Sequence, residues 1–397
     1  MMHMTMSTES ALGHFDRHPL WRLGFRPLYA CAAFAALMLP PLWVLLLSGG
    51  WSLPEDVSPI FWHMHEMIFG FAGATIVGFL FTAGRVWTGL PTPRGLHLAS
   101  YAGLWLAARI AGVTGPYPVF MVLDLAFLPL AAACFFDLIL QSRNYRNLGI
   151  AAILAALAAL NLASHLAHAG LLPMAARTPM HGAVLLITLL ESVIAGRIIP
   201  SFTMNALKGV QISAHPLMDR LTIATTLTAG LAWMAWSAHP LTALTLGAAS
   251  ALHLSRSWRW KAGALAQMPL LWILHLSYLW IGLGLALLSA SAAGLLPASV
   301  AIHALSVGAM GGLILGMITR TALGHTGRVL SAGRLEIVAY ALVMGAALTR
   351  VLLPLAGPSG HALAIPLAAG LWALAFGLYL IRYLPMLMAA RVDGREG

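Results

Sequence analysis

The sequence predicts an all-α polytopic membrane protein with about twelve transmembrane helices. Three observations support this fold class: a very apolar composition, twelve separate apolar runs, and the placement of Lys and Arg between those runs. Of the 397 residues, 60% are hydrophobic and only 9% are charged, whereas an average soluble domain carries about a quarter charged residues. Most of the chain is therefore expected to lie in a lipid bilayer.

Each apolar run is long enough to form one membrane-spanning helix. Crossing the hydrocarbon layer takes about 20 apolar residues, because every backbone N–H and C=O must be satisfied within its own helix. The runs lie near residues 29–48, 61–83, 97–113, 117–140, 148–171, 179–199, 219–237, 240–256, 268–293, 298–320, 334–356 and 360–389. They predict a single twelve-helix domain over residues 28–389, with a cytoplasmic N-terminal segment at 1–27 and a cytoplasmic tail at 390–397.

The basic residues predict the orientation of these helices. Of the 22 Lys and Arg, nineteen fall in the N-terminal segment, in the even-numbered connections or after the last run, and only Arg109, Arg177 and Arg350 fall on the other side. The positive-inside rule then places both termini on the cytoplasmic side of a bacterial inner membrane. The basic residues are strung out singly, so the net charge of +10 reflects topology, and no nucleic-acid partner is expected.

Histidines open three of the apolar runs at similar intervals. The second, sixth and tenth runs begin with His63 and His65, with His181 and with His303, spaced 118 and 122 residues apart, and glycine recurs deep in each. Small residues let helices approach closely in lipid. We therefore predict three similar four-helix arcs, with these three helices innermost; the arcs comprise residues 28–140, 148–256 and 268–389.

Such an arrangement resembles the twelve-helix catalytic subunit of the haem-copper oxidases. Two features of that subunit are missing, because the seventh run here contains no histidine and the tenth opens with a single one. An oxidase with two haems is therefore not expected.

The histidines are candidate metal ligands, because neutral imidazole is the usual protein ligand for haem iron and for copper. A helix N-terminus favours the neutral form of the ring. We predict that His65 and His303 are the axial ligands of a haem, and that copper is held by His181 and His63. For each histidine alone, an interfacial residue bonded to headgroups or a loop is an open alternative. The roles of His63 and His65 could also be exchanged.

Further candidates lie near the same side of the membrane. His165 and His168 are three residues apart and share one helix face, so they could complete the copper site or simply occupy the wet interface. Glu66 is a candidate catalytic group, either for proton delivery or for a bond to an imidazole, although an acid at a helix N-terminus is common. His275 lies deep in its run and needs either a ligand role or a Ser or Tyr partner.

Cysteine chemistry is not expected to contribute. Cys31 and Cys134 both fall inside predicted helices, where they suit packing. The sequence has no CxxCH motif, so any haem would be bound noncovalently, as a b-type haem is.

Several of these segments resemble the NnrS family of bacterial inner-membrane proteins, which is associated with the nitric oxide response and with haem and copper. The matching segments are LGFRPLY at 23–29, WHMHEMIFGFAGATIVGFLFTAGRVWTG at 62–89, MHGAVL at 180–185, GRIIPSFT at 196–203 and IHALSVGAMGGLILGMITRTALGHTGR at 302–328. The resemblance spans most of the chain and implies a metalloprotein that handles nitric oxide in nitrosative stress.

We therefore expect a haem-copper oxidoreductase of the nitric oxide reductase type, which binds nitric oxide and reduces it to nitrous oxide with electrons from an unknown donor. Two other functions remain open. One is a non-enzymatic haem or copper sensor of nitric oxide, or a metal-handling protein. The other is a twelve-helix transporter with the histidines at its entry site.

Overall fold

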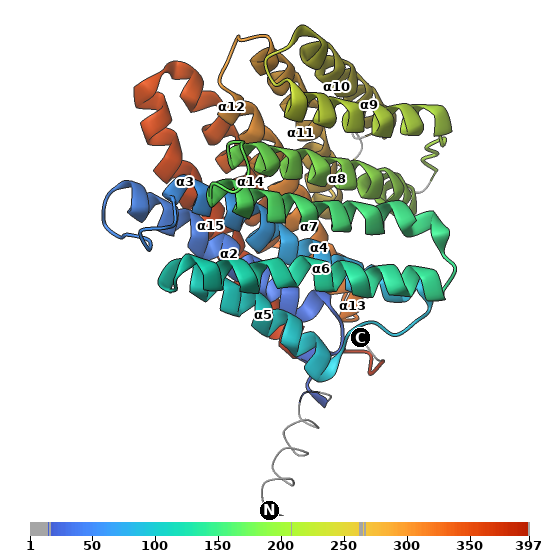
Figure 1. Cartoon of the computed structure of the whole chain (residues 1–397). Helices are drawn as coiled ribbons and strands as arrows, with labels where there is room; N and C mark the ends of the chain where they lie inside the picture. The colour runs from blue at the N-terminus through green and yellow to red at the C-terminus, as the bar shows by residue number, and fades with distance from the viewer. Residues whose placement is uncertain (1–14, 16, 208, 262–264, 266, 396–397) are drawn as a thin grey trace, which may run out of the picture. The chain divides into compact units, whose positions relative to one another are not determined.

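The chain folds as a succession of helices, as the computed structural model shows (Figure 1). It describes residues 15, 17–207, 209–261, 265 and 267–395, and no β-strand occurs among them. Parts of the predicted N-terminal segment and tail, and Lys208, lie outside these residues. Each of the twelve predicted apolar runs coincides with one helix or with one helix interrupted by a change of pitch. The prediction of an all-α polytopic protein is therefore confirmed.

Nine of the helices in the described part of the chain are long and apolar enough to cross a membrane. The remaining three helices of the predicted twelve are α5 (Gly95–Thr114), α9 (Pro216–Ala235) and α10 (Pro240–Arg259), each 20 residues long. Their length suffices to span the hydrocarbon layer at about 1.5 Å per residue. They are less apolar because α9 is rich in threonine and α10 carries buried His253 and Arg256.

The chain divides into two compact units, which differ in extent from the predicted four-helix arcs. Unit 1 consists of Met1–Pro173, Ile318–Leu330 and Phe376–Gly397, and unit 2 of Met174–Met317 and Ser331–Ala375. Two helices, α13 (Gly312–His325) and α15 (Pro358–Met388), contribute to both units. The threefold repeat stays a prediction.

Unit 1 is built around a long interrupted helix made of α3 (Pro59–His65), η2 (Glu66–Ala72) and α4 (Gly73–Thr88). Around it pack α2 (Phe25–Leu47), α5 and α6 (Tyr117–Gln141), and α7 (Leu148–His168) packs against α6. Proline at the first helical position starts α3, where its missing N–H costs nothing. Gly89, in the left-handed conformation with φ 71°, ends α4.

Unit 2 contains α8 (Arg177–Ala206), α9, α10 and α11 (Pro269–Ala292), in which each helix packs against the next. A second interrupted helix follows, formed by α12 (Ala298–His303), η5 (Ala304–Gly311) and α13. Its segment η5 packs against α11 and against α14 (Arg334–Leu352).

The two interrupted helices share one structural feature, a π-helical segment that follows a histidine. Segments η2 and η5 are π-helical, and each begins directly after a predicted ligand histidine, His65 in unit 1 and His303 in unit 2. A π-helical turn is rare and is frequently found at functional sites. The two helices that the sequence paired by their histidines are thus also paired by their geometry.

Candidate metal centre

The π-helical segment η2 directs His65 into the interior of unit 1. Gly70 within this segment has no side chain, and a Cβ atom there would lie only 2.6 Å from Nη1 of Arg109. The indole N–H of Trp105 donates to the carbonyl oxygen of Gly70 at 2.9 Å, which satisfies a backbone group of the π-helix. Contacts with Trp105 and Arg109 of α5 therefore help to hold the segment η2 in place.

Three side chains from three helices converge at this point: His65 at the end of α3, Asp124 on α6 and His165 on α7. One potential ligand atom from each lies within 4.8 Å of the others. The Nε2 atoms of both imidazoles are 3.2 Å from Oδ2 of Asp124, and all three residues are buried. Two histidines and one carboxylate form a donor set that binds zinc, copper or ferrous iron.

Hydrogen bonds on the outer side of each imidazole orient it for ligation. The Nδ1 atom of His65 lies 3.2 Å from Oε1 of Glu66, and that of His165 lies 2.8 Å from the hydroxyl oxygen of Tyr117. The Tyr117 hydroxyl also donates to the carbonyl oxygen of His165 at 3.2 Å. Its oxygen can therefore accept a hydrogen bond from Nδ1–H of His165. When Nδ1 of each ring donates outward, each Nε2 presents a lone pair to the centre, as metal-binding histidines do.

When both imidazoles carry their proton on Nδ1, the atoms that face one another in the centre are all hydrogen-bond acceptors. The amide oxygen of Asn161 is 2.9 Å from Nε2 of His65, and the amide nitrogen of Asn161 donates to Oδ2 of Asp124 at 2.6 Å. Two imidazole nitrogens, a carboxylate oxygen and an amide oxygen thus meet in a buried space. Such a set requires a positive group between its members, either a proton on an imidazole or a metal cation.

The charges around the centre favour a cation as well. Arg109 of α5 donates to Oδ1 of Asp124, and its Nη1 atom is 3.2 Å from Oε1 of Glu66. One guanidinium therefore faces two buried carboxylates, which leaves one negative charge when both imidazoles are neutral. A buried charge without a partner is unfavourable by several kcal/mol. A bound cation would offset it.

Aromatic side chains surround the imidazoles. The ring of His65 has centroid distances of 5.4 Å to Phe61, 5.1 Å to Phe69 and 5.2 Å to Phe120. Phe120 is also 5.3 Å from the ring of His165. This apolar shell lowers the local dielectric and strengthens every electrostatic interaction at the centre.

The other two candidates of unit 1 lie outside this group. The imidazole of His63 stacks on Trp43 of α2 at a centroid distance of 4.5 Å. That of His168 stacks on Phe61 at 3.9 Å, and its Nε2 donates to the carbonyl oxygen of Asp56 at 3.0 Å. His63 and His65 do contact different neighbours, and the three-residue spacing of His165 and His168 does not bring both to one ion.

His181 and His303 belong to unit 2. His181 is half-buried, with its ring 6.3 Å from that of Trp233. His303 donates from Nδ1 to the carbonyl oxygen of Ser299 at 2.6 Å. His275 has a hydroxyl partner as the sequence suggested, but the hydroxyl is that of Thr203, at 2.9 Å, rather than of Ser or Tyr.

Sequence reasoning missed Asp124 and Asn161, and it counted Arg109 only as one of three basic residues on the non-cytoplasmic side. Arg109 instead lies within α5 with its side chain only 10% exposed, paired with two carboxylates. The presence of charged residues inside apolar runs could have revealed the pair, because ionisable residues within membrane helices are rare and almost always have a partner. Arg109 and Asp124 are opposite charges in successive apolar runs.

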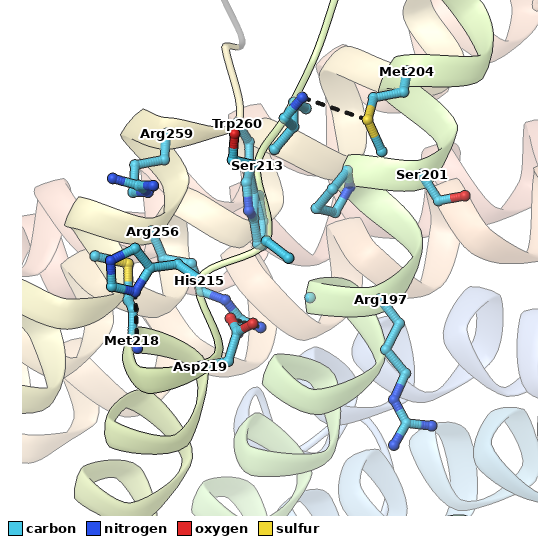
Figure 2. A pocket seen from close by; sticks show the side chains of 14 residues that line it. Arg197, Ser201, Met204, Ser213, His215, Met218, Asp219, Arg256, Arg259 and Trp260 are labelled. Atoms are coloured by element: carbon cyan, nitrogen blue, oxygen red, sulfur yellow. Dashed lines mark hydrogen bonds and ion pairs between the residues drawn. The ribbon is translucent and has the colours of Figure 1, made fainter.

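Unit 2 has a separate polar site, a pocket of about 180 Å³ between α8, α9 and α10 (Figure 2). Buried Arg256 lies at its wall and pairs with Asp219 at 2.8 Å. It also donates to the backbone carbonyl of Ser192 at 3.0 Å and to the hydroxyl of Tyr278 at 3.1 Å. One arginine thus joins four helices of unit 2. A Cβ atom at Gly196 would meet the guanidinium of Arg256, so a side chain there would have to displace this group.

Comparison with known proteins gives one clear relationship. A search of curated protein sequences found no match to the chain. The family model described as NnrS protein matches residues 19–391. This region includes all of the described membrane helices, the π-helical segments and the centre formed by His65, Asp124 and His165. Because the match covers nearly the whole chain, the protein belongs to the NnrS family.

Proposed function

We propose that this NnrS-family membrane protein binds a metal ion between His65, Asp124 and His165 and that nitric oxide binds at this ion. The observation that carries the proposal is the convergence of two imidazoles and a carboxylate in a buried, apolar part of unit 1. Nitric oxide is small and neutral and dissolves in lipid. A site inside a helix bundle therefore needs no charged entrance.

Copper or ferrous iron suits this centre better than zinc. Both accept imidazole and carboxylate ligands, and both are redox-active, which zinc is not. Three protein ligands leave coordination positions open for a small molecule, as in the two-histidine, one-carboxylate centres of iron enzymes. Bound here, such an ion would supply a redox-active centre.

A haem ligated by His65 fits these residues less well than a metal ion. An axial histidine needs one ring nitrogen directed at a flat space for the macrocycle. Both ring nitrogens of His65 lie within 3.2 Å of carboxylate oxygens, and three phenyl rings surround the imidazole. We therefore assign His65 to the metal ion. The assignment of a haem to His303 stays a prediction, which a Soret band lost in His303→Ala would support.

Glu66 is placed to hold a proton beside the centre. Its Oε1 contacts both His65 and Arg109, whereas its Oε2 is buried without a hydrogen-bond partner in the described structure. Reduction of two nitric oxide molecules to nitrous oxide and water consumes two protons and two electrons. Glu66 would donate a proton next to the ion, and the electrons would come from an external electron donor.

Metal analysis of purified variants tests the proposal. We expect about one copper or iron ion per chain in the wild type. His165→Ala should lose most of this metal, because the two remaining ligands, His65 and Asp124, bind an ion far more weakly than three do. His168→Ala is the matched control, since His168 is on the same helix and outside the centre. It should keep its metal.

Nitric oxide binding is measured on the same preparations. Adding nitric oxide anaerobically should change the electron paramagnetic resonance spectrum of the wild type and of His168→Ala, but not that of His165→Ala. Full metal content in His165→Ala would refute the assignment of the centre. Release of nitrous oxide with a chemical reductant would then distinguish an enzyme from a sensor.

A further inference from the structure

In unit 1, the buried guanidinium of Arg26 has fewer hydrogen-bond partners than donors. Arg26, the second residue of α2, is fully buried. Its Nη1 atom donates to the carbonyl oxygens of Leu387 and Ala389 at 2.7 and 2.8 Å, which satisfies backbone groups at the end of α15. Its Nε and Nη2 atoms are buried and have no hydrogen-bond partner in the described structure.

Further positive charges surround Arg26. Its electrostatic neighbours are Arg22, Arg328 and Arg391. The Nη1 atom of Arg328 is likewise buried without a hydrogen-bond partner. We call these four residues the arginine cluster. Within the described structure, the carboxylate that contacts the cluster is Asp393, which accepts from Nε of Arg391 at 2.6 Å.

The charges of the cluster do not balance. The cluster holds four guanidinium groups. Against them stand one carboxylate, which contacts Arg391, and the partial negative charge at the end of α15, which contacts Arg26 and is about half an elementary charge. Burying an unpaired ionic group is unfavourable by several kcal/mol, and each unsatisfied donor adds to this. The Arg391 guanidinium holds the pKa of Asp393 below its usual value, so Asp393 is already ionised at neutral pH. Its charge cannot increase further.

The cluster brings together two segments that are far apart in the sequence. Arg26 lies in LGFRPLY at 23–29, and Arg328 ends the segment TALGHTGR. The rings of Phe25 and His325 from these segments have a centroid distance of 5.5 Å. The C-terminal tail joins them, because the backbone N–H of Val392 donates to the carbonyl oxygen of Thr326 at 3.2 Å. The cluster is therefore a defined site rather than a set of surface charges.

The position of the cluster indicates the kind of anion that it would meet. Arg26 is at the start of a membrane helix, and helices enter the bilayer at the level of the lipid headgroups. Phosphate oxygens are abundant there. Guanidinium groups bind them through paired, charge-assisted hydrogen bonds.

We propose that the arginine cluster binds a phosphate group, carried either by the headgroup of an anionic lipid or by a soluble phosphate. The unpartnered donors of Arg26 and Arg328 are the groups that contact it. This site is separate from the metal centre and does not depend on its function.

Ligand-dependent stability of the whole purified protein tests this proposal. The melting temperature is measured in detergent with added phosphatidylglycerol, with the same amount of phosphatidylcholine, or with inorganic phosphate. Phosphatidylglycerol should raise the melting temperature of the wild type, while phosphatidylcholine should not. In Arg328→Gln, the concentration needed for half the effect should rise about tenfold, because one charged hydrogen bond is lost.

Arg328 is the residue to change, because Arg26 also holds the end of α15. Arg334→Gln removes the same charge from an exposed position at the start of α14 and should respond as the wild type does. A response to inorganic phosphate alone would support the phosphate site with a soluble ligand. Equal responses of Arg328→Gln and wild type would overturn the proposal. So would equal effects of the two lipids together with no effect of inorganic phosphate.

Discussion

At the scale of single residues, the hydrogen bonds behind the ligands decide how well the centre of unit 1 binds metal. Tyr117 illustrates this, because its hydroxyl group accepts from Nδ1 of His165 and donates to the carbonyl oxygen of the same residue. Groups that orient a ligating histidine commonly change metal affinity 10- to 100-fold, on the order of 1–3 kcal/mol. The structure gives Glu66 the corresponding position behind His65.

Tyr117→Phe should therefore weaken metal binding by about one to two orders of magnitude without removing it. The phenyl ring still fills the space, so the fold should be retained. Competition with a chelator of known affinity measures the change. Tyr145→Phe is the matched control, since Tyr145 is 60% exposed and distant in sequence from the centre. An unchanged affinity in Tyr117→Phe would mean that the tautomer of His165 is fixed in another way.

The residues of the centre were only partly predictable. His65, His165 and Glu66 were found because histidines and acids stand out in an apolar sequence. Periodicity could not show that α6 faces these histidines, so Asp124 and Asn161 were missed. The choice between His165 and His168 also depended on packing, because both occupy the same helix face and only the position of Phe61 and Asp124 separates them.

At the scale of elements, the twelve helices were predictable because each needs one apolar run of nearly fixed length. Predicted and observed limits differ mainly where polar residues extend a helix beyond the apolar run. The helix that begins at Pro59 ends at Thr88, five residues after the predicted end, because Gly84 and Arg85 are still helical. The π-helical segments could not be predicted, since hydrophobic periodicity does not distinguish a single wide turn from an ordinary one.

Gly70 links the π-helical segment to the centre, and Gly70→Ala tests that link. The added methyl group would contact the guanidinium of Arg109, so it should displace this side chain from Glu66 and Asp124. We expect a loss of about 1–3 kcal/mol in stability and a lower metal content. Thermal unfolding and metal analysis measure the two effects.

Gly103→Ala on α5 is the control for this substitution. A Cβ atom there meets nothing within 4 Å, and alanine favours a helix over glycine by about 1 kcal/mol. This variant should be as stable as the wild type or slightly more stable. A stable Gly70→Ala with full metal content would show that Arg109 can move without cost.

At the scale of the whole molecule, the distribution of charge carries the remaining prediction. Three basic residues that were counted in assigning the orientation are buried in helices, namely Arg26, Arg109 and Arg256. Arg256 pairs with Asp219, and Arg109 with Glu66 and Asp124, so these two contribute little to the orientation of the chain. The positive-inside rule should therefore be applied to the exposed basic residues alone.

The exposed residues still favour one orientation. Arg94, Arg143, Arg220, Arg259 and Arg334 are exposed and all belong to the side predicted as cytoplasmic. A reporter that is active only in the cytoplasm should therefore be active when fused to the C-terminus. A reporter that is active only in the periplasm should be active when inserted near residue 55, between α2 and α3. If both results were reversed, the centre would lie near the cytoplasmic surface and the arginine cluster near the periplasmic one. Arg26 lies near the start of α2 and His65 near the start of the interrupted helix that begins at Pro59, and successive helices are expected to cross the membrane in opposite directions. Equal activity of the C-terminal fusion with both reporters would instead indicate dual topology, which the excess of positive charge on one side does not predict.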